Sequence, residues 1–111
     1  MRDDRERLRD ILEAIERIEK YALLGRAKFD ADELIQTWIL HHIQVIGEAC
    51  RGLSEEFRSV HPEFPWNRII GMRNVLVNRY FGIDRDLVWV VVESNLPALK
   101  DQVREFLRDQ T

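Results

Sequence analysis

Four polar side chains lie within eight residues of one another in the middle of the sequence: Arg73, Asn74, Asn78 and Tyr80. If this segment is helical, Arg73 and Tyr80 are seven residues apart and nearly eclipsed, while Asn74 and Asn78 are four apart and adjacent. All four would then share one broad face of the helix. The spacing therefore predicts a polar site on a single helical face.

Apolar side chains, Val75 and Leu76 among them, are expected on the opposite, buried face of that helix. The polar group is therefore not needed to build the core. An arginine with nearby amides and a phenol is suited to binding an anion such as a phosphodiester. It is not a complete acid-base site, because neither an amide nor an arginine exchanges a proton near neutral pH.

A purely structural interpretation of the same residues stays open at this stage. Arg73 would pair with a carboxylate such as Glu48 across a helix interface, and Asn78 and Tyr80 would only end their helix. A third interpretation is a helical dimer of structural purpose, in which replacing Arg73 alters stability alone.

The charge distribution supports a localised anion site. The net charge of the 111 residues is −3, which argues against a protein that coats nucleic acid through bulk electrostatics. Residues 66–85 contain four arginines and one aspartate, so this segment carries +3 and the remainder carries −6. Such a basic patch can hold a phosphate without tight nonspecific binding.

The first half of the chain predicts two long helices. Apolar residues at spacings of three and four, with Arg and Glu between them, indicate a helix over residues 4–24. Residues 26–30 are expected to be a short polar connection. A second helix is expected over residues 31–51, with Asp30 as its N-cap and Glu33 completing a capping-box-like pair.

That second helix is apolar on two adjoining stripes, where one would suffice for a simple core. The extra stripe suggests burial on two sides, in the monomer core and against another subunit. A monomer in which this helix is central remains an alternative. The sequence alone does not decide between the two.

The second half predicts a short helix over residues 54–60, capped by Ser54, and a third long helix over residues 66–80 that ends before Gly82. A fourth helix should follow, capped by Asp84. Its internal Pro97 must kink or divide it near Asn95, because proline lacks the backbone donor and clashes with the preceding turn. We therefore predict an all-α, up-and-down bundle of four main helices plus a short helix, in one domain spanning residues 1–111.

Other features limit the functional classes. Cys50 is the only cysteine, and its setting indicates a buried thiol on a helix. His41 and His42 point about 100° apart on a helix and do not form a paired metal site, and His61 is expected to face solvent. With no metal-ligand spacing and no glycine-rich phosphate loop, no metal or cofactor is expected. The charged N-terminus and the lack of a long apolar run predict a soluble cytoplasmic protein without membrane contact.

The motif segment resembles the signature of the HepT-like HEPN toxins. The pattern of that family is Arg, four residues, His, one residue, Tyr, and its three marked positions are occupied by Arg73, Asn78 and Tyr80. The resemblance spans nearly the whole chain. Further matches are Gly71-Met72 and Gly82-Ile83-Asp84 around the motif, Ile46-Gly47-Glu48-Ala49 in the second helix, and Pro65-Trp66 before the third.

This resemblance implies a metal-independent endoribonuclease that works as a homodimer, with the motif segments of two subunits facing one cleft. The implied partner is a minimal nucleotidyltransferase (MNT) antitoxin. By carry-over, Arg73 holds the scissile phosphate and Asn74 supports it. Tyr80 matches the tyrosine that such antitoxins modify with AMP, which would place negative phosphate over the basic cleft. Arg79, Arg68 and Glu48 are expected as supporting, RNA-binding residues.

The sequence departs from the family pattern at Asn78, where the motif has histidine. A carboxamide can donate and accept hydrogen bonds but cannot serve as general acid or base. We therefore expect RNA recognition with impaired turnover, whether the substitution is natural or deliberate. The alternative from another class is a noncatalytic HEPN module that binds a nucleotidyltransferase or a nucleotide through the same cleft.

Overall fold

The computed structural model describes residues 3–62, 64–78 and 82–109. The N-terminal helix α1 (Asp4–Ala22) buries the apolar stripe that its sequence spacing predicted. Asp3 caps it, because the Asp3 carboxylate accepts a hydrogen bond from the backbone N–H of Glu6 at 2.9 Å. The first predicted helix is thus confirmed, ending two residues earlier than expected.

The expected polar connection over residues 26–30 is wrong, because this segment forms the short helix α2 (Arg26–Ala31). Gly25 precedes it with a φ of 91°, a left-handed conformation that glycine adopts without strain. Phe29 explains the helix, since its side chain is only 1% exposed and anchors the segment in the core.

The cap of the next helix also differs from the expectation. Helix α3 (Glu33–Gly52) is capped by Asp32, whose carboxylate accepts from the backbone N–H of Leu34 at 2.9 Å. Asp30, the expected cap, lies inside α2 and pairs with Arg26 instead. The helical turn of α2 moves the capping position two residues along the chain, so the predicted capping box does not form.

Short elements connect α3 to the helices at the C-terminal end of the chain. Ser54 caps α4 (Glu55–Val60) as predicted, with Phe57 N donating to Ser54 Oγ at 3.0 Å. The elements that follow are α5 (Trp66–Ile70), α6 (Met72–Leu76), β1 (Val77–Asn78), β2 (Gly82–Ile83) and α7 (Arg85–Val90), which Asp84 caps as predicted.

Pro97 divides the last helix near Asn95, as the sequence predicted. A turn of π-helix, η1 (Val91–Asn95), connects α7 to α8 (Leu96–Asp109). Its wider hydrogen bonding is visible at Leu96, whose N–H donates to the carbonyl of Val91, five residues earlier. Pro97 follows η1 closely, as the second residue of α8, and the wider π-helical turn before it lets the chain continue as a helix past the proline ring.

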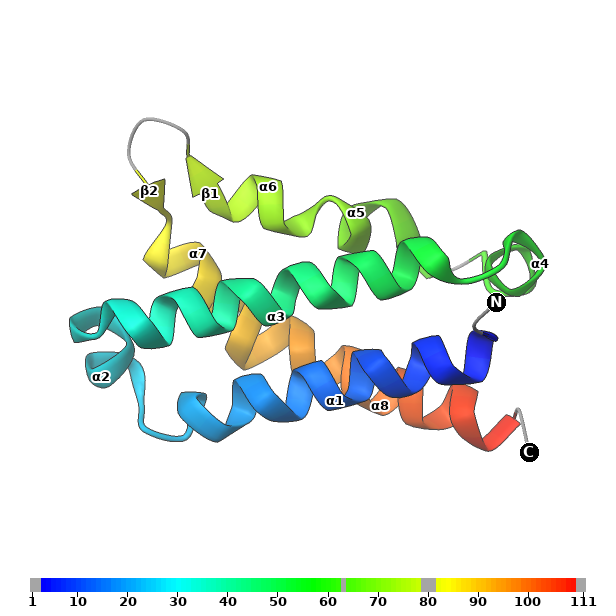
Figure 1. Cartoon of the computed structure of the whole chain (residues 1–111), viewed down its shortest axis with the longest axis horizontal. Helices are drawn as coiled ribbons and strands as arrows, with labels where there is room; N and C mark the ends of the chain where they lie inside the picture. Colours follow the sequence, from blue (N-terminus) through cyan, green and yellow to red (C-terminus); the bar gives the residue numbers. More distant parts are fainter. Residues whose placement is uncertain (1–2, 63, 79–81, 110–111) are drawn as a thin grey trace.

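Figure 1 shows α3 as the central layer, with α5 and α6 on one side and α1 and α8 on the other. One apolar stripe packs within the chain, but the second is only partly covered, since Leu34 is 80% exposed and Trp38, Leu40 and Val45 are half-buried. The homodimer therefore stays a prediction. The predicted all-α bundle is confirmed, although its third long helix is broken into α5, α6 and β1.

The core lies between these layers. Four aromatic rings, Phe57, Phe64, Trp66 and Phe106, join α4, α5 and α8 at one end, with ring centroids between 4.5 and 6.1 Å apart. His61 is half-buried and packs there as well, 4.3 Å from Phe106 by ring centroids, so it faces solvent less than expected. The buried apolar side chains of the three long helices are Leu8, Ile11, Ala14, Ile15, Ile18, Ile35, Ile39, Ile43, Ile46, Ala49, Cys50, Leu96, Leu99, Val103 and Phe106.

Candidate functional site

The segment that carries the motif is a broken helix followed by a short β-strand. Gly71 separates α5 from α6, and the backbone N–H of Asn74 donates to the Gly71 carbonyl at 3.1 Å, a tight three-residue spacing. Helix α6 ends at Leu76, which is 1% exposed as predicted, whereas Val75 is 70% exposed and not part of the core. The single continuous helix over residues 66–80 is therefore wrong.

After Leu76 the backbone becomes extended and turns back on itself. Val77 pairs with Ile83 and Asn78 with Gly82 in an antiparallel register, and the N–H of Asp84 donates to the Leu76 carbonyl at 2.9 Å. Gly82 has a φ of 80°, which suits this return. Valine and asparagine are weak helix formers, so the hairpin replaces the last helical turns.

This hairpin changes the predicted geometry of the motif. Asn78 does not follow Asn74 on a helical face, because the main chain of Asn78 belongs to β1. The shared face predicted from helical spacing is therefore wrong for this pair. Arg79 and Tyr80 lie outside the described residues.

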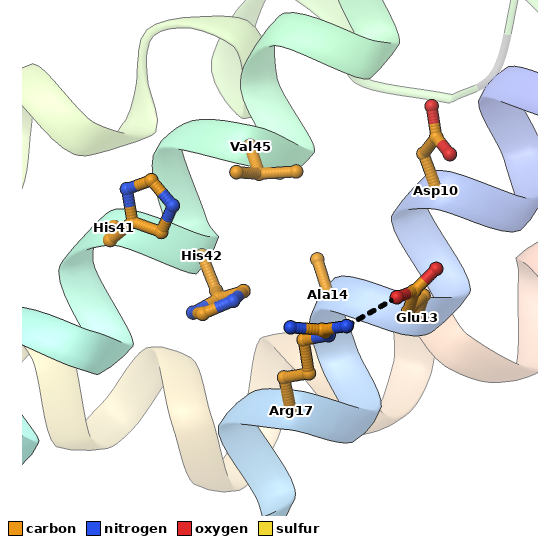
Figure 2. A pocket seen from close by; sticks show the side chains of 7 residues that line it. All are labelled: Asp10, Glu13, Ala14, Arg17, His41, His42 and Val45. Atoms are coloured by element: carbon orange, nitrogen blue, oxygen red, sulfur yellow. Dashed lines mark hydrogen bonds and ion pairs between the residues drawn. The ribbon is translucent and has the colours of Figure 1, made fainter.

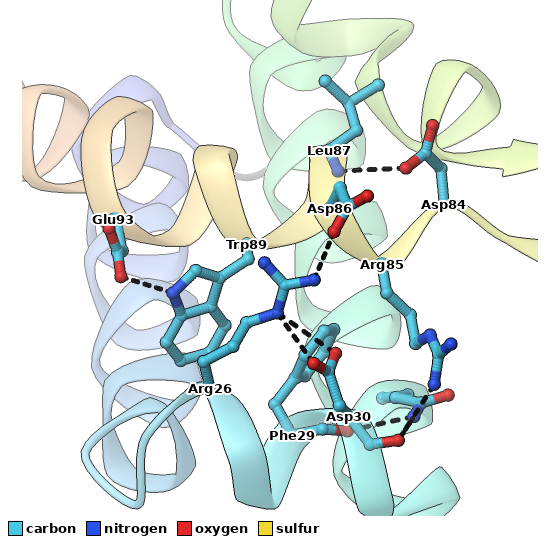
Figure 3. Close-up of polar contacts among 10 residues, drawn as sticks. Arg26, Phe29, Asp30, Asp84, Arg85, Asp86, Leu87, Trp89 and Glu93 are labelled. Atoms are coloured by element: carbon cyan, nitrogen blue, oxygen red, sulfur yellow. Dashed lines mark hydrogen bonds and ion pairs between the residues drawn. The ribbon is translucent and has the colours of Figure 1, made fainter.

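Polar contacts between α2 and α7, the helix that follows the hairpin, hold the hairpin in place (Figure 3). Arg26 pairs with Asp30 at 3.0 Å and also with Asp86, and Arg85 Nη1 donates to the Asp30 carbonyl at 3.1 Å. The hydrogen bond from Arg26 lowers the pKa of Asp86, and the same contact raises the pKa of Arg26. Since α7 follows β2 directly, these contacts hold the base of the hairpin against α2.

Close contact between α3 and α5 brings the motif arginine to the surface of α3. A Cβ added to Gly47 would lie 3.1 Å from the carbonyl oxygen of Ile70 and 3.5 Å from that of Ile69. Only glycine leaves room for the α5 backbone at this distance without a shift. The chain that continues from Ile70 into α6 therefore runs directly over the second half of α3.

A polar pocket of about 250 Å³ lies along this contact, lined by residues of α3, α5 and α6. Arg73 Nη1 donates to Asn74 Oδ1 at 3.5 Å, and Arg51 Nη1 lies 3.5 Å from Glu48 Oε1. The Arg73–Glu48 pair that the purely structural interpretation requires does not form, and each of the two side chains contacts a different residue instead. The lining residues are Gln44, Glu48, Arg51, Ile70, Arg73 and Asn74.

Some site residues were predicted and others were missed. The structure brings together Arg73, Asn74 and Glu48, but Arg68 lines a different pocket, between α5 and α8. Gln44 and Arg51 were not predicted. A signal for them exists in the sequence, because Gln44, Glu48 and Arg51 recur at i, i+4 and i+7 and form a polar stripe on an otherwise apolar helix.

The histidines of the chain lie elsewhere. Figure 2 shows His41 and His42 in a groove between α1 and α3, beside the Glu13–Arg17 ion pair of 2.7 Å. His42 is buried, and its Nδ1 donates to the Trp38 carbonyl at 2.8 Å. None of the three histidines lines the pocket of Arg73, so none is placed there to replace the histidine of the motif.

The pocket offers two guanidinium groups, one carboxylate and two amides, a set suited to a phosphate diester. Within residues 3–62, 64–78 and 82–109, no group of three or more His, Cys, Asp or Glu side chains is arranged to hold a metal ion. In the same described part of the chain, no helix is both long and apolar enough to span a membrane.

Comparison with known proteins now identifies the family. The family model described as Ribonuclease HepT-like matches residues 11–106, and the chain therefore belongs to the HepT-like ribonuclease family. This match confirms the resemblance to the HepT-like HEPN family that the motif indicated. No solved structure gives a significant match to the chain.

Three relatives illustrate the similarity. The chain is 35% identical to "Probable ribonuclease HepT" of Thermococcus cleftensis, over 89% of this chain and 91% of that protein. It is 32% identical to a provisionally named RNase of Caldanaerobacter subterraneus, over 99% of both chains. It is also 35% identical to a Methanocaldococcus jannaschii protein named as a gamma-glutamylcyclotransferase and, provisionally, an RNase. The match covers 92% of this chain but only 46% of that longer relative.

Proposed function

We propose that this protein is the toxin of a HEPN/MNT toxin-antitoxin pair, built as a metal-independent endoribonuclease and impaired in catalysis by Asn78. The observation that carries the proposal is the pocket in which Arg73 and Asn74 meet the polar stripe of α3. Membership of a ribonuclease family and the RNase names of relatives support RNA as the ligand.

The chemistry requires a phosphate ligand and a proton carrier. In the proposed reaction the 2′-oxygen of a ribose bonds to the adjacent phosphorus while the bond from phosphorus to the 5′-oxygen breaks. The proton of the 2′-hydroxyl is lost and the 5′-oxygen gains one, leaving a 2′,3′-cyclic phosphate. Arg73 would hold the phosphate and offset the charge that develops on it, and Asn74 would orient the guanidinium.

Asn78 supplies no proton carrier at the position where the motif has histidine. General acid-base catalysis is typically worth about 10²–10⁴-fold in rate. We therefore expect RNA binding to be retained while cleavage is slower by a factor in this range than in a variant with histidine at this position.

The proposed partners follow from the family resemblance. Two copies of the chain would form a homodimer whose motif segments face one cleft, and an MNT-type nucleotidyltransferase would act as antitoxin. Transfer of AMP from ATP to the Tyr80 hydroxyl, with loss of the hydroxyl proton and release of pyrophosphate, would place a phosphate next to the basic residues of the motif and exclude RNA by charge repulsion. A mass measurement of protein coexpressed with such an enzyme tests this part, since AMP adds to Tyr80 only if the proposal holds.

The central experiment restores the histidine. Asn78→His should raise cleavage of a single-stranded RNA and toxicity in cells, and Arg73→Ala in that background should remove both. Arg104→Gln, a change at an exposed position of α8, is the matched control and should leave the restored activity unchanged. A histidine variant that binds RNA but cleaves no faster than the original chain would overturn the catalytic proposal.

Asparagine at position 78, where the motif has histidine, favours one second candidate, a noncatalytic HEPN module that binds a nucleotidyltransferase or nucleotide through the same pocket. Under this alternative Arg73→Ala weakens complex formation, and RNA stays uncut after histidine is restored. The same two variants therefore distinguish the candidates when partner binding is measured beside RNA cleavage.

A further inference from the structure

The α3 side of the pocket contributes a second cation that the motif does not include. Gln44, Glu48 and Arg51 are spaced so that they follow one face of α3, and this face borders Arg73. Because the α5 backbone packs directly on Gly47, the α6 segment that carries Arg73 is held beside this stripe. Two guanidinium groups from different helices thus share one pocket.

Both guanidinium groups are weakly engaged in the protein itself. The contacts of Arg51 with Glu48 and of Arg73 with Asn74 are each 3.5 Å long, at the limit of a hydrogen bond. Arg17, by contrast, holds Glu13 at 2.7 Å. The side chains of Arg51 and Glu48 are 63% and 60% exposed, and exposed pairs of this kind contribute little to stability.

We propose that Arg51 is a second phosphate-binding residue of this site and, together with Arg73, holds the backbone of one RNA strand. The inference rests on the proposed function. On binding, Arg51 exchanges its long contact with Glu48 for a bidentate contact with phosphate oxygens, a geometry that guanidinium groups favour. Glu48 then lies beside the RNA backbone as a restraining negative charge, which keeps binding weaker than two arginines alone would make it.

A purely structural role for Arg51 makes a different prediction. Arg51 belongs to the last turn of α3, where a cation is favourable because of the helix dipole and can also pair with Glu48 one turn earlier. In that case Arg51→Gln would lower stability slightly and leave RNA binding unchanged.

The test is the salt dependence of RNA binding, which counts phosphate contacts. A fluorescent, single-stranded oligoribonucleotide of mixed sequence is titrated with the full chain at several salt concentrations, with anisotropy as the readout. For single strands the slope of log K against log salt is about −0.7 per phosphate contact, so Arg51→Gln should make the slope shallower by about 0.7. If the lines for the two proteins converge near 1 M salt, this difference makes binding about eightfold weaker at about 50 mM.

Three further variants make the result specific. Arg73→Gln should lose a similar slope, and Arg51→Lys should keep the slope because the charge remains. Glu48→Gln should bind RNA more tightly than the original chain. The matched control is Arg104→Gln, which removes one arginine from an exposed position of α8 and should leave RNA binding unchanged. Thermal melting shows whether each variant is folded.

Two outcomes would overturn the inference, and they differ in what else they affect. If Arg73→Gln weakens binding while Arg51→Gln matches Arg104→Gln, Arg51 is not a phosphate-binding residue, and the proposed RNA site at Arg73 stands. If the original chain binds no RNA at low salt, the proposed function and this inference both fail.

Discussion

Replacing Gly47 with alanine tests the packing that positions the site. The added Cβ would lie 3.1 Å from the Ile70 carbonyl oxygen, and a few tenths of an ångström must be gained by moving backbone, because no flexible side chain is available to move aside. Overpacking of this kind costs about 2 kcal/mol. Alanine in a helix interior recovers about 1 kcal/mol relative to glycine. We therefore expect Gly47→Ala to lower the free energy of unfolding by about 1 kcal/mol.

That loss should appear in urea denaturation followed by circular dichroism, and as a decrease of about 4 °C in Tm. Gly71→Ala is the matched control, since its Cβ would lie 3.4 Å from the nearest atom and the residue has a φ of −90°, which alanine adopts freely. It should be neutral or slightly stabilising. If Gly47→Ala instead stabilises the protein by about 1 kcal/mol, only helix propensity is acting, and α5 does not press on α3 as described.

Two other residues give simpler tests. Phe106→Ala should lower the free energy of unfolding by about 3–5 kcal/mol, because the ring is 3% exposed and packs against Phe57 and Trp66. Val90→Ala, at an exposed position, should change the free energy of unfolding little. Similar denaturation midpoints for the two variants would contradict the assigned core. Burial raises the pKa of the Cys50 thiol to about 12, so iodoacetamide should not modify this thiol at pH 8 until denaturant is added. Labelling of the folded protein at the rate of a free thiol would contradict the burial of Cys50.

The sequence was most informative where periodicity and caps agree. Helix α1, the Ser54 and Asp84 caps and the division before Pro97 were all predicted, because each depends on interactions within a few residues. The expected loop at residues 26–30 failed for another reason. The helix there is stabilised by burial of Phe29 against distant elements, and such a contact cannot be predicted from the local composition of residues 26–30.

The candidate site was predicted only in part, because some of its contacts join segments that are distant in the sequence. Arg73, Asn74 and Glu48 share a pocket, as the motif and its flanking match suggested. Helical periodicity placed Asn78 wrongly, since the hairpin depends on a pairing with Gly82 that spacing along a helix cannot indicate. Arg51 was missed because a motif-based search considers one segment, while the pocket is formed where two segments meet.

The π-helical turn η1 has a consequence for how the last helix tolerates changes of length. Val91, the first residue of η1, and Leu96, the first residue after it, are both buried and five apart, whereas Leu96 and Leu99 follow the usual spacing of three. The wide turn thus accommodates one additional residue without rotating the apolar stripe of α8 away from the core. Loss of one residue within η1 would leave a spacing of four, which an ordinary α-helix also keeps on one face. At residues 91–95, between α7 and α8, the chain can therefore shorten by one residue while α8 keeps its orientation.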